Sequence, residues 1–187
     1  VLGEGPRDSL MRALTRHSVF CLLAAVLLSG AMLSATPARA ATEYEIKAAF
    51  ILNFVKFTRW PAGADTGDIH ICVLGQNPFQ GALRVMMRKT VRDRRIMVRE
   101  ISQDAFDGCD VLFVAKSAAD KAKPVLEALN GRPILTIGDH DGFISSGGAI
   151  NLYLVNGKVR FEARPATAKA AGLTISSRLL KLAKIRR

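Results

Sequence analysis

The first strong hydrophobic pattern after residue 40 is that of a buried helix. Between Glu43 and Trp60, apolar side chains recur at the three- and four-residue spacing of one helix face. Neighbouring apolar residues widen this stripe, so the helix should be largely buried. Pro61 cannot continue a helix and disfavours helical angles in the residue before it, so the helix should end there. The stripe comprises Ile46, Ala49, Phe50, Phe54 and Phe57.

Four short apolar runs that follow predict strands, and two further helices lie between them. A helix begins at Pro78, a residue favoured at the first helical position, and another extends over 118–129 and stops at Asn130 and Gly131. Alternation of strands and helices predicts an α/β fold with a mostly parallel sheet flanked by helices. The four runs are residues 69–74, 94–101, 110–115 and 133–139.

The pattern changes after residue 148. Residues 149–163 contain two alternating runs separated by Asn156 and Gly157, which predicts a C-terminal β-hairpin. Residues 165–187 then predict a long terminal helix. Gly172 inside that helix is unfavourable by about 1 kcal/mol relative to Ala, so we expect either a packing reason for it or a break there.

Residues 1–40 predict an N-terminal extension and a secretory signal peptide. Met11 is the expected start, basic residues precede the apolar run 20–33, and the small-x-small sequence that ends at Ala40 predicts cleavage after it. The apolar run is shorter than the roughly 20 residues of a membrane helix, so a retained anchor is the less favoured alternative. The mature chain, residues 41–187, should form a single domain that does not span the membrane and is exported to the periplasm.

Charge narrows the class of partner. The chain has a formal net charge of +11, and loss of four arginines and two acidic residues with the leader lowers it to +9. A basic surface favours lipid headgroups, cell-wall acids or an acidic protein face. Nucleic acid is not an expected partner, because the charges are dispersed and an exported chain rarely meets it.

The cysteines agree with export. Cys21 leaves with the leader, and Cys72 and Cys109 remain in a compartment that oxidises thiols. Because βαβ units commonly place the first and third strands side by side, a disulfide between these two cysteines fits the predicted sheet. It should stabilise the fold by about 3–4 kcal/mol in the chain-entropy model. Two buried free thiols are the alternative.

Catalytic motifs are weak. Asp139, His140 and Asp141 could be drawn as a metal site, but three consecutive residues rarely all face one ion, and a turn is the favoured interpretation. The Ser145–Gly148 segment lacks the pattern of a nucleophile elbow, and Gly75 alone does not make a phosphate loop. We therefore expect a protein without enzymatic activity, metal or cofactor.

Binding residues are the remaining candidates. Large or charged side chains near the ends of elements are typical of binding surfaces, and Trp and Arg dominate interface energies. The alternative is that Trp60 caps a core helix and that the charged residues are solvated or paired with one another. The candidates are Arg59, Trp60, Glu162, Arg164 and Arg178.

Four segments resemble the YfiR-like family of periplasmic regulators: EIKAAFILNFVKFTRWP, ICVLGQNPF, GKVRFEA and AAGLTISSRLLKLAKI. The resemblance implies an α/β protein, often a homodimer. It also implies binding to the periplasmic sensor domain of an inner-membrane diguanylate cyclase, inhibition of cyclic-di-GMP synthesis, and release by an outer-membrane OmpA-like lipoprotein. Cys72 and Cys109 match one disulfide pair of the family. A second pair has no counterpart, since no cysteine follows Cys109.

The resemblance and the candidate residues suggest one hypothesis about the site. Phe50, Phe54 and Phe57 should anchor the first helix in the core, with Arg59 and Trp60 emerging at its exposed end. Trp60, Glu162 and Arg178 should then border a surface for a partner or ligand. The rival hypothesis is a periplasmic binding module for an amino acid or cell-wall fragment, and an enzyme that depends on His140 comes third.

Overall fold

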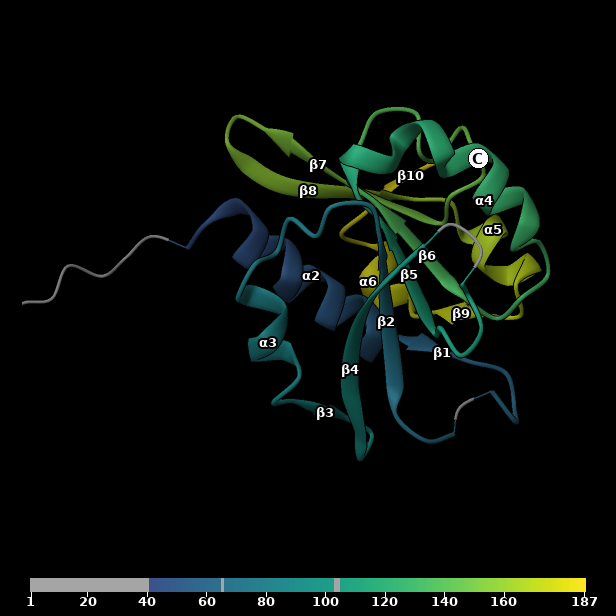
Figure 1. Ribbon diagram of the computed structural model, residues 1–187. Coiled ribbons are helices and arrows are strands. Elements are labelled where there is room, and N and C mark those ends of the chain that lie inside the picture. Colours follow the sequence, from purple (N-terminus) through teal and green to yellow (C-terminus); the bar gives the residue numbers. More distant parts are fainter. Residues whose placement is uncertain (1–40, 65, 103–104) are drawn as a thin grey trace, which may run out of the picture. The chain divides into compact units, whose positions relative to one another are not determined.

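The computed structural model describes residues 41–64, 66–102 and 105–187 (Figure 1). The predicted leader, with its start at Met11 and cleavage after Ala40, lies outside these residues. Within the described part, no helix combines the length and apolar character needed to cross a bilayer.

Most strands of the described residues join one eight-stranded sheet in the order β10-β8-β7-β6-β5-β2-β4-β3. The central pairs β4–β2, β2–β5, β5–β6 and β6–β7 are parallel, whereas β7–β8 and β3–β4 are antiparallel. The predicted mixed, mostly parallel sheet is confirmed. The strands are β2 (Ile69–Leu74), β3 (Thr90–Val91), β4 (Arg94–Ile101), β5 (Val111–Val114), β6 (Leu135–Gly138), β7 (Ile150–Val155), β8 (Lys158–Ala163) and β10 (Lys184–Ile185).

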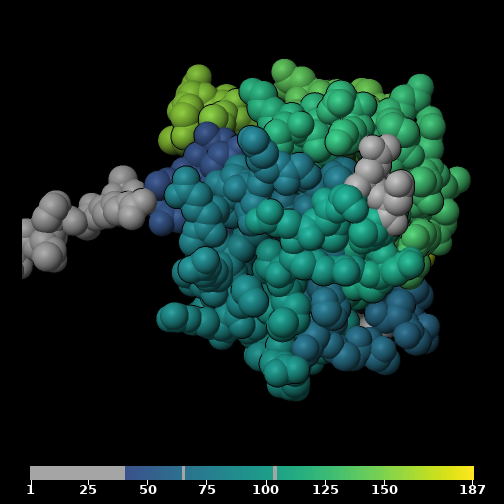
Figure 2. Space-filling model, in the orientation of Figure 1, coloured from purple at the N-terminus to yellow at the C-terminus, as the bar shows by residue number. Residues whose placement is uncertain are grey.

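Helices cover the two faces of the sheet through two separate hydrophobic clusters. One face packs against α2, α3, α5 and α6, and the other packs against η2 and α4. In the orientation of Figures 1 and 2, η2 and α4 lie on the viewer's side. The helices are α2 (Glu43–Phe57), α3 (Ala82–Met86), the 3-10 helix η2 (Lys116–Lys121), α4 (Ala122–Ala128), α5 (Pro165–Ala170) and α6 (Ser177–Leu180).

Helix α2 begins at a capping box. The Thr42 hydroxyl accepts a hydrogen bond from the Glu45 amide at 3.3 Å, and the Glu45 carboxylate accepts one from the Thr42 amide at 2.6 Å. Phe54 is fully buried as predicted, and Phe50 is partly buried against the same core. Phe57, in contrast, is 38% exposed, so the prediction that it anchors the helix is wrong.

The helix also ends earlier than predicted. It stops at Phe57, and the next two residues form β1 (Thr58–Arg59), which pairs antiparallel with β9 (Thr174–Ile175). Pro61 favours an extended backbone in the residue before it. The extended segment in fact already begins at Thr58, three residues before Pro61. This short ladder joins the end of α2 to the C-terminal segment.

The predicted long terminal helix is wrong, and Gly172 is the reason. Residues 165–187 break into α5, β9, α6 and β10. Gly172 has φ +73°, and the Gly172 and Leu173 amides donate to the carbonyls of Lys169 and Ala168, which is the Schellman arrangement that ends a helix. A Cβ at this glycine would also lie 3.5 Å from the Pro61 ring. Of the two outcomes expected at Gly172, a packing reason or a break, the structure therefore shows the break.

The predicted hairpin is confirmed. Asn156 and Gly157 have φ of +49° and +71°, as the two central residues of a type I′ turn require, and they join β7 to β8. The tip of this hairpin projects from the rest of the sheet (Figure 1). Leu154 and Val155, close to the tip, are exposed.

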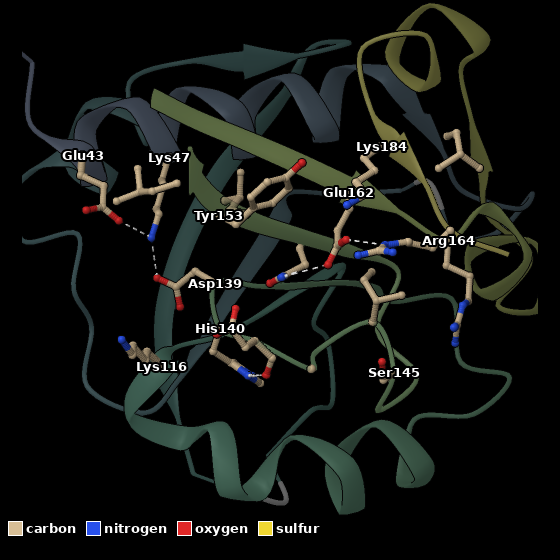
Figure 3. A pocket seen from close by; sticks show the side chains of 18 of the residues that line it. Glu43, Lys47, Lys116, Asp139, His140, Ser145, Tyr153, Glu162, Arg164 and Lys184 are labelled. Atoms are coloured by element: carbon tan, nitrogen blue, oxygen red, sulfur yellow. Dashed lines mark hydrogen bonds and ion pairs between the residues drawn. The ribbon is translucent and has the colours of Figure 1, made fainter. Parts of the chain in front are cut away.

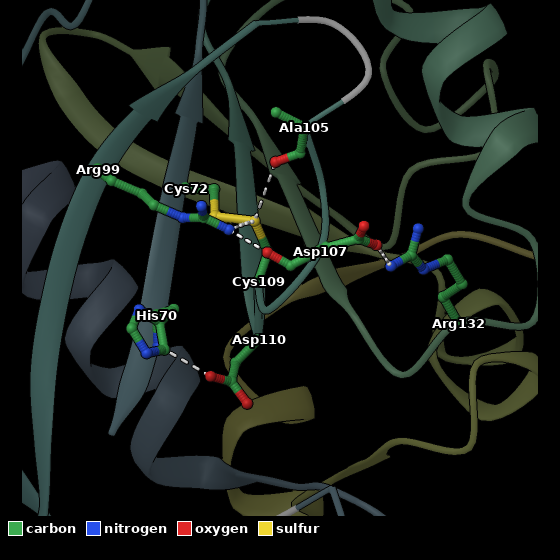
Figure 4. The surroundings of a disulfide bond; sticks show 8 residues. All are labelled: His70, Cys72, Arg99, Ala105, Asp107, Cys109, Asp110 and Arg132. Carbon is green, nitrogen blue, oxygen red and sulfur yellow. Dashed lines mark hydrogen bonds and ion pairs between the residues drawn. A yellow bond between two sulfur atoms is a disulfide. The ribbon is translucent and has the colours of Figure 1, made fainter. Parts of the chain in front are cut away.

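The predicted disulfide is present, and the alternative of two free thiols is wrong (Figure 4). Cys72 lies in β2 and Cys109 lies just before the neighbouring parallel strand β5, with 5.9 Å between their Cα atoms. The Arg99 guanidinium approaches the Cys109 sulfur at 3.4 Å and donates to the backbone carbonyl of Asp107. The bond therefore ties β2 to the start of β5 within the second hydrophobic cluster.

Candidate functional site

The five predicted binding residues lie in two different places. Arg59, Trp60 and Arg178 line a groove at the C-terminal end of α2, whereas Glu162 and Arg164 line a cavity that reaches the N-terminal end of the same helix. The structure therefore does not bring Trp60, Glu162 and Arg178 together on one surface as predicted. The two places differ in charge and in burial.

The groove is cationic. Its volume is about 870 Å³, and its lining contains four basic side chains and no acidic one among the described residues. Such a surface has a positive potential and attracts anionic groups. We call it the cationic groove and define it by Lys56, Phe57, Arg59, Trp60, Arg92, Thr174, Ser176 and Arg178.

Backbone geometry gathers these cations. Arg59 lies opposite Thr174 in the β1–β9 ladder, and α6 then begins with Arg178 in its first turn. The Arg92 guanidinium donates to the carbonyls of Thr58 at 3.1 Å and Lys56 at 3.5 Å, at the C-terminal end of α2. A cation is favourable at that end, because unpaired carbonyls give it a negative dipole.

Trp60 does not emerge from the fold as predicted. Only 6% of it is exposed, and it packs within the main hydrophobic cluster. Its indole Nε1 is buried and has no hydrogen-bond partner among the described residues. Trp60 therefore forms part of the floor of the cationic groove. Arg59 and Arg178 are exposed there and can be reached by a partner, as can Lys56, Phe57 and Arg92.

The second place is a cavity of about 920 Å³ at the carboxyl edge of the sheet, lined by the start of α2, by Lys116 of η2 and by residues of β7, β8 and β10 (Figure 3). It extends from the carboxyl ends of β5 and β6, where Lys116, Asp139 and His140 lie, to Glu162 on β8 and Lys184 on β10. Open α/β sheets bind ligands at the carboxyl ends of their strands. We call this place the polar cavity.

A buried ion pair closes one end of the polar cavity (Figure 3). Lys47 Nζ lies 2.9 Å from Asp139 Oδ2, and the two side chains are 4% and 1% exposed. Lys47 also pairs with Glu43 at 2.6 Å, and the Tyr44 hydroxyl donates to Asp139 Oδ2 at 3.0 Å. The pair links the first turn of α2 to the end of β6.

This network moves two pKa values upward. Burial raises the pKa of Tyr44, and the Asp139 carboxylate beside it raises that pKa further. Burial alone would lower the pKa of Lys47, but its bonds to Glu43 and Asp139 outweigh that effect and raise the pKa above its ordinary value. Lys47 is therefore held as a cation in the interior.

Polar atoms in the cavity lining remain unpaired. Asp139, His140 and Asn151 are 8%, 8% and 3% exposed, and each has one buried polar atom without a hydrogen-bond partner in the described part of the chain. Arg164 Nε is also buried without a hydrogen-bond partner among the described residues. Buried polar atoms are nearly always satisfied in native proteins, so these atoms mark a place for water or a ligand.

Glu162 is the centre of the other end of the cavity. Its carboxylate accepts from Asn151 Nδ2 at 3.3 Å and pairs with Arg186 Nε at 2.6 Å. Lys184 lies beside Glu162 in the parallel pairing of β10 with β8. Glu162 is therefore ion-paired, but with Arg186 and not with one of the candidate arginines, as the alternative had it.

Several residues of both places were not predicted. Asp139 directly follows a buried parallel strand, which is a recognisable signal for the carboxyl edge of the sheet. Lys47 lies four residues before Ile51 on the buried face of α2, so a lysine within an apolar stripe was a second signal. Asn151 and Arg92 left no comparable signal, because strand register places Asn151 and the turn between β3 and β4 places Arg92. In the described residues, no group of three or more His, Cys, Asp and Glu side chains could hold a metal ion.

Comparison with known proteins adds two findings. A family model described as YfiR/HmsC-like matches residues 44–184, which is more than half of the chain. A crystal structure of a conserved domain protein from Vibrio cholerae O1 biovar El Tor is similar, with a TM-score of 0.54 and 13% sequence identity. That match covers 78% of this chain and 60% of the Vibrio chain, and at this identity it supports the fold alone.

Proposed function

The chain belongs to the YfiR/HmsC-like family, which is known for periplasmic regulation of diguanylate cyclases, and from this premise we propose that it inhibits a diguanylate cyclase by binding that enzyme's periplasmic sensor domain. The chain would act in the periplasm, by contact and not by catalysis. Cyclic-di-GMP synthesis would be low while the two proteins are bound. An outer-membrane OmpA-like lipoprotein would relieve the inhibition by competing for the chain.

The cationic groove supports this proposal. Arg59 and Arg178 are exposed on one surface, and no acidic side chain lies in the groove lining of the described chain. Arginine forms strong paired hydrogen bonds with carboxylates and is enriched at protein interfaces. We propose that the groove receives an acidic segment of the sensor domain. The rim charges would raise the association rate, and the apolar floor formed by Phe57 and Trp60 would slow dissociation.

The test measures cyclic-di-GMP in living cells. The full-length chain is co-expressed in a heterologous host with each membrane-bound diguanylate cyclase of its own organism in turn. With one such cyclase, cyclic-di-GMP should fall when the chain is present. The double variant Arg59→Glu, Arg178→Glu should abolish most of that fall, because it places two carboxylates opposite the acidic segment.

Arg88 supplies a matched control. It is exposed near the end of α3 and lies outside the groove, so Arg88→Glu makes the same kind of charge change elsewhere on the surface. That variant should inhibit as the wild type does. The proposal would be wrong if no cyclase responds to the wild-type chain, and the groove assignment would be wrong if the double variant inhibits normally at equal protein level.

A further inference from the structure

The unpaired atoms of the polar cavity have a definite hydrogen-bonding character. Asp139 Oδ2 already accepts from Lys47 and Tyr44, which leaves Oδ1 as a free acceptor. Asn151 donates through Nδ2 to Glu162, which leaves its Oδ1 as a second free acceptor. Both atoms need donors, and hydroxyl groups are the neutral donors best able to reach several acceptors in one cavity.

His140 adds a third acceptor. Its Nδ1 lies 3.0 Å from the backbone oxygen of Asp141, and a carbonyl oxygen can only accept. Nδ1 must therefore carry the hydrogen, and in the neutral ring Nε2 is left with a lone pair. This Nε2 is buried, and no residue in the described ranges bonds to it. Three acceptors from the end of β6 and from β7 thus line one cavity.

The charged side chains of the same cavity favour an anionic group on the ligand. Lys47 pairs with Glu43 and Asp139, and Arg186 pairs with Glu162, so these three carboxylates are already ion-paired. Lys116 and Lys184 are exposed at the cavity rim, and the structure pairs neither of them with an acidic group of the described chain.

Arg164 contributes a buried Nε donor without a partner among the described residues, although its Nη2 donates to the Arg187 carbonyl at 3.5 Å. The lining has an excess of positive charge, because its basic side chains (Lys47, Lys116, Arg164, Lys184, Arg186 and Arg187) outnumber its acidic ones (Glu43, Asp139, Asp141 and Glu162). Asp141 is the acidic lining residue that is likewise left without an ion-pair partner in the described ranges. An anionic group on the ligand would balance this excess of positive charge.

Size and shape limit the ligand further. A volume of about 920 Å³ is within the range of small-molecule sites. The Tyr153 side chain, which is half-buried, belongs to the cavity lining and lies near Glu162 in the view of Figure 3. An aromatic ring face is a suitable contact for the C–H face of a sugar ring, because it is both apolar and electron-rich.

We propose that the polar cavity binds a sugar acid. The ring hydroxyls donate to Asp139, Asn151 and His140, and the carboxylate lies toward Lys184 and Arg164. The site would bind this ligand whether or not the chain inhibits a cyclase, since it uses neither Arg59 nor Arg178 of the cationic groove.

Isothermal titration calorimetry of the full-length protein tests the ligand class with three probes. D-glucuronate carries both features, D-glucose has hydroxyls without the acid, and glutarate has carboxylates without hydroxyls. Glucuronate should bind saturably, and each of the other two should bind at least tenfold more weakly. Absence of glucuronate binding, or equal binding of either other probe, would overturn the proposal.

Variants locate the binding. Asn151→Leu should weaken glucuronate binding at least tenfold, and thermal unfolding of this variant reports whether the fold survives. The double variant Lys116→Ala, Lys184→Ala changes exposed rim residues only and should weaken binding by a similar factor with unchanged unfolding. Lys123→Ala, on the exposed side of α4 and outside the cavity, is the control and should bind normally. Wild-type affinity in the double lysine variant would place binding elsewhere and refute the site.

Discussion

The buried pair of Lys47 and Asp139 yields the sharpest prediction about stability. The substitution Lys47→Met keeps a side chain of similar length but removes the charge. The Asp139 carboxylate, only 1% exposed, would then retain one direct partner among the described residues, the Tyr44 hydroxyl at 3.0 Å. We expect Lys47→Met to be strongly destabilising.

The expected size follows from the geometry. Breaking a buried ion pair by removing one partner usually destabilises by about 3–5 kcal/mol, because the remaining charge is left buried and uncompensated. The Lys47–Asp139 pair, at 2.9 Å with both side chains almost fully buried, belongs to this class. For a domain of this size, 1 kcal/mol corresponds to roughly 2–4 °C in Tm, so Lys47→Met should lower Tm by on the order of 10 °C.

Urea unfolding of the oxidised protein, followed by circular dichroism, measures the change. Glu43→Gln is the control, because it removes the other and more exposed carboxylate partner of Lys47 and should lower stability by less than about 1 kcal/mol. The double variant Lys47→Met, Asp139→Leu should regain most of the loss, since it removes both charges. If the free energy of unfolding of Lys47→Met lies within about 1 kcal/mol of the wild-type value, the substitution does not leave a buried, uncompensated charge on Asp139, and the reasoning is wrong.

Three further predictions concern other parts of the fold. Stability should decrease above about pH 10, because the folded state keeps protons on Tyr44 and on the buried lysine that the unfolded chain releases, and Tyr44→Phe should reduce this decrease in urea titrations at pH 8 and above. Reduction of the Cys72–Cys109 disulfide should cost about 4 kcal/mol for its loop, and an unchanged urea midpoint in dithiothreitol would contradict this. Gly148→Ala should destabilise by about 1–3 kcal/mol in thermal unfolding, because the new Cβ would lie 2.2 Å from the Phe143 ring.

Much of the fold could be predicted because its strands are short, apolar and separated by recognisable turns. The parallel core, the hairpin turn at Asn156 and the disulfide partners all follow from local patterns with a known physical meaning. The C-terminal segment could not be predicted in the same way. Its apolar spacing fits a helix, and the left-handed conformation of Gly172, with the local hydrogen bonds to Lys169 and Ala168, decides that the helix stops.

The site was less predictable than the fold for a related reason. Arg59 and Arg178 were recognised as charged residues near the ends of elements, but Arg92, which joins them in the cationic groove, comes from the turn between β3 and β4. The burial of Trp60 followed from packing that a single sequence does not reveal. Lys47 and Asp139 are far apart in the chain, and they meet only because α2 covers the sheet with its first turn at the carboxyl end of β6.

The break at Gly172 connects the fold to both candidate sites. Because α5 ends there, Thr174 can pair with Arg59 in a short ladder, and the next turn carries Arg178 into the cationic groove. The same shortened path lets the chain return as β10, where Lys184 lies beside Glu162 at the wall of the polar cavity. A continuous helix from Pro165 could make neither connection, since all its backbone groups would be paired within the helix. One glycine with positive φ therefore places a charged residue in each site, and the two sites share a structural origin although they lie at opposite ends of α2.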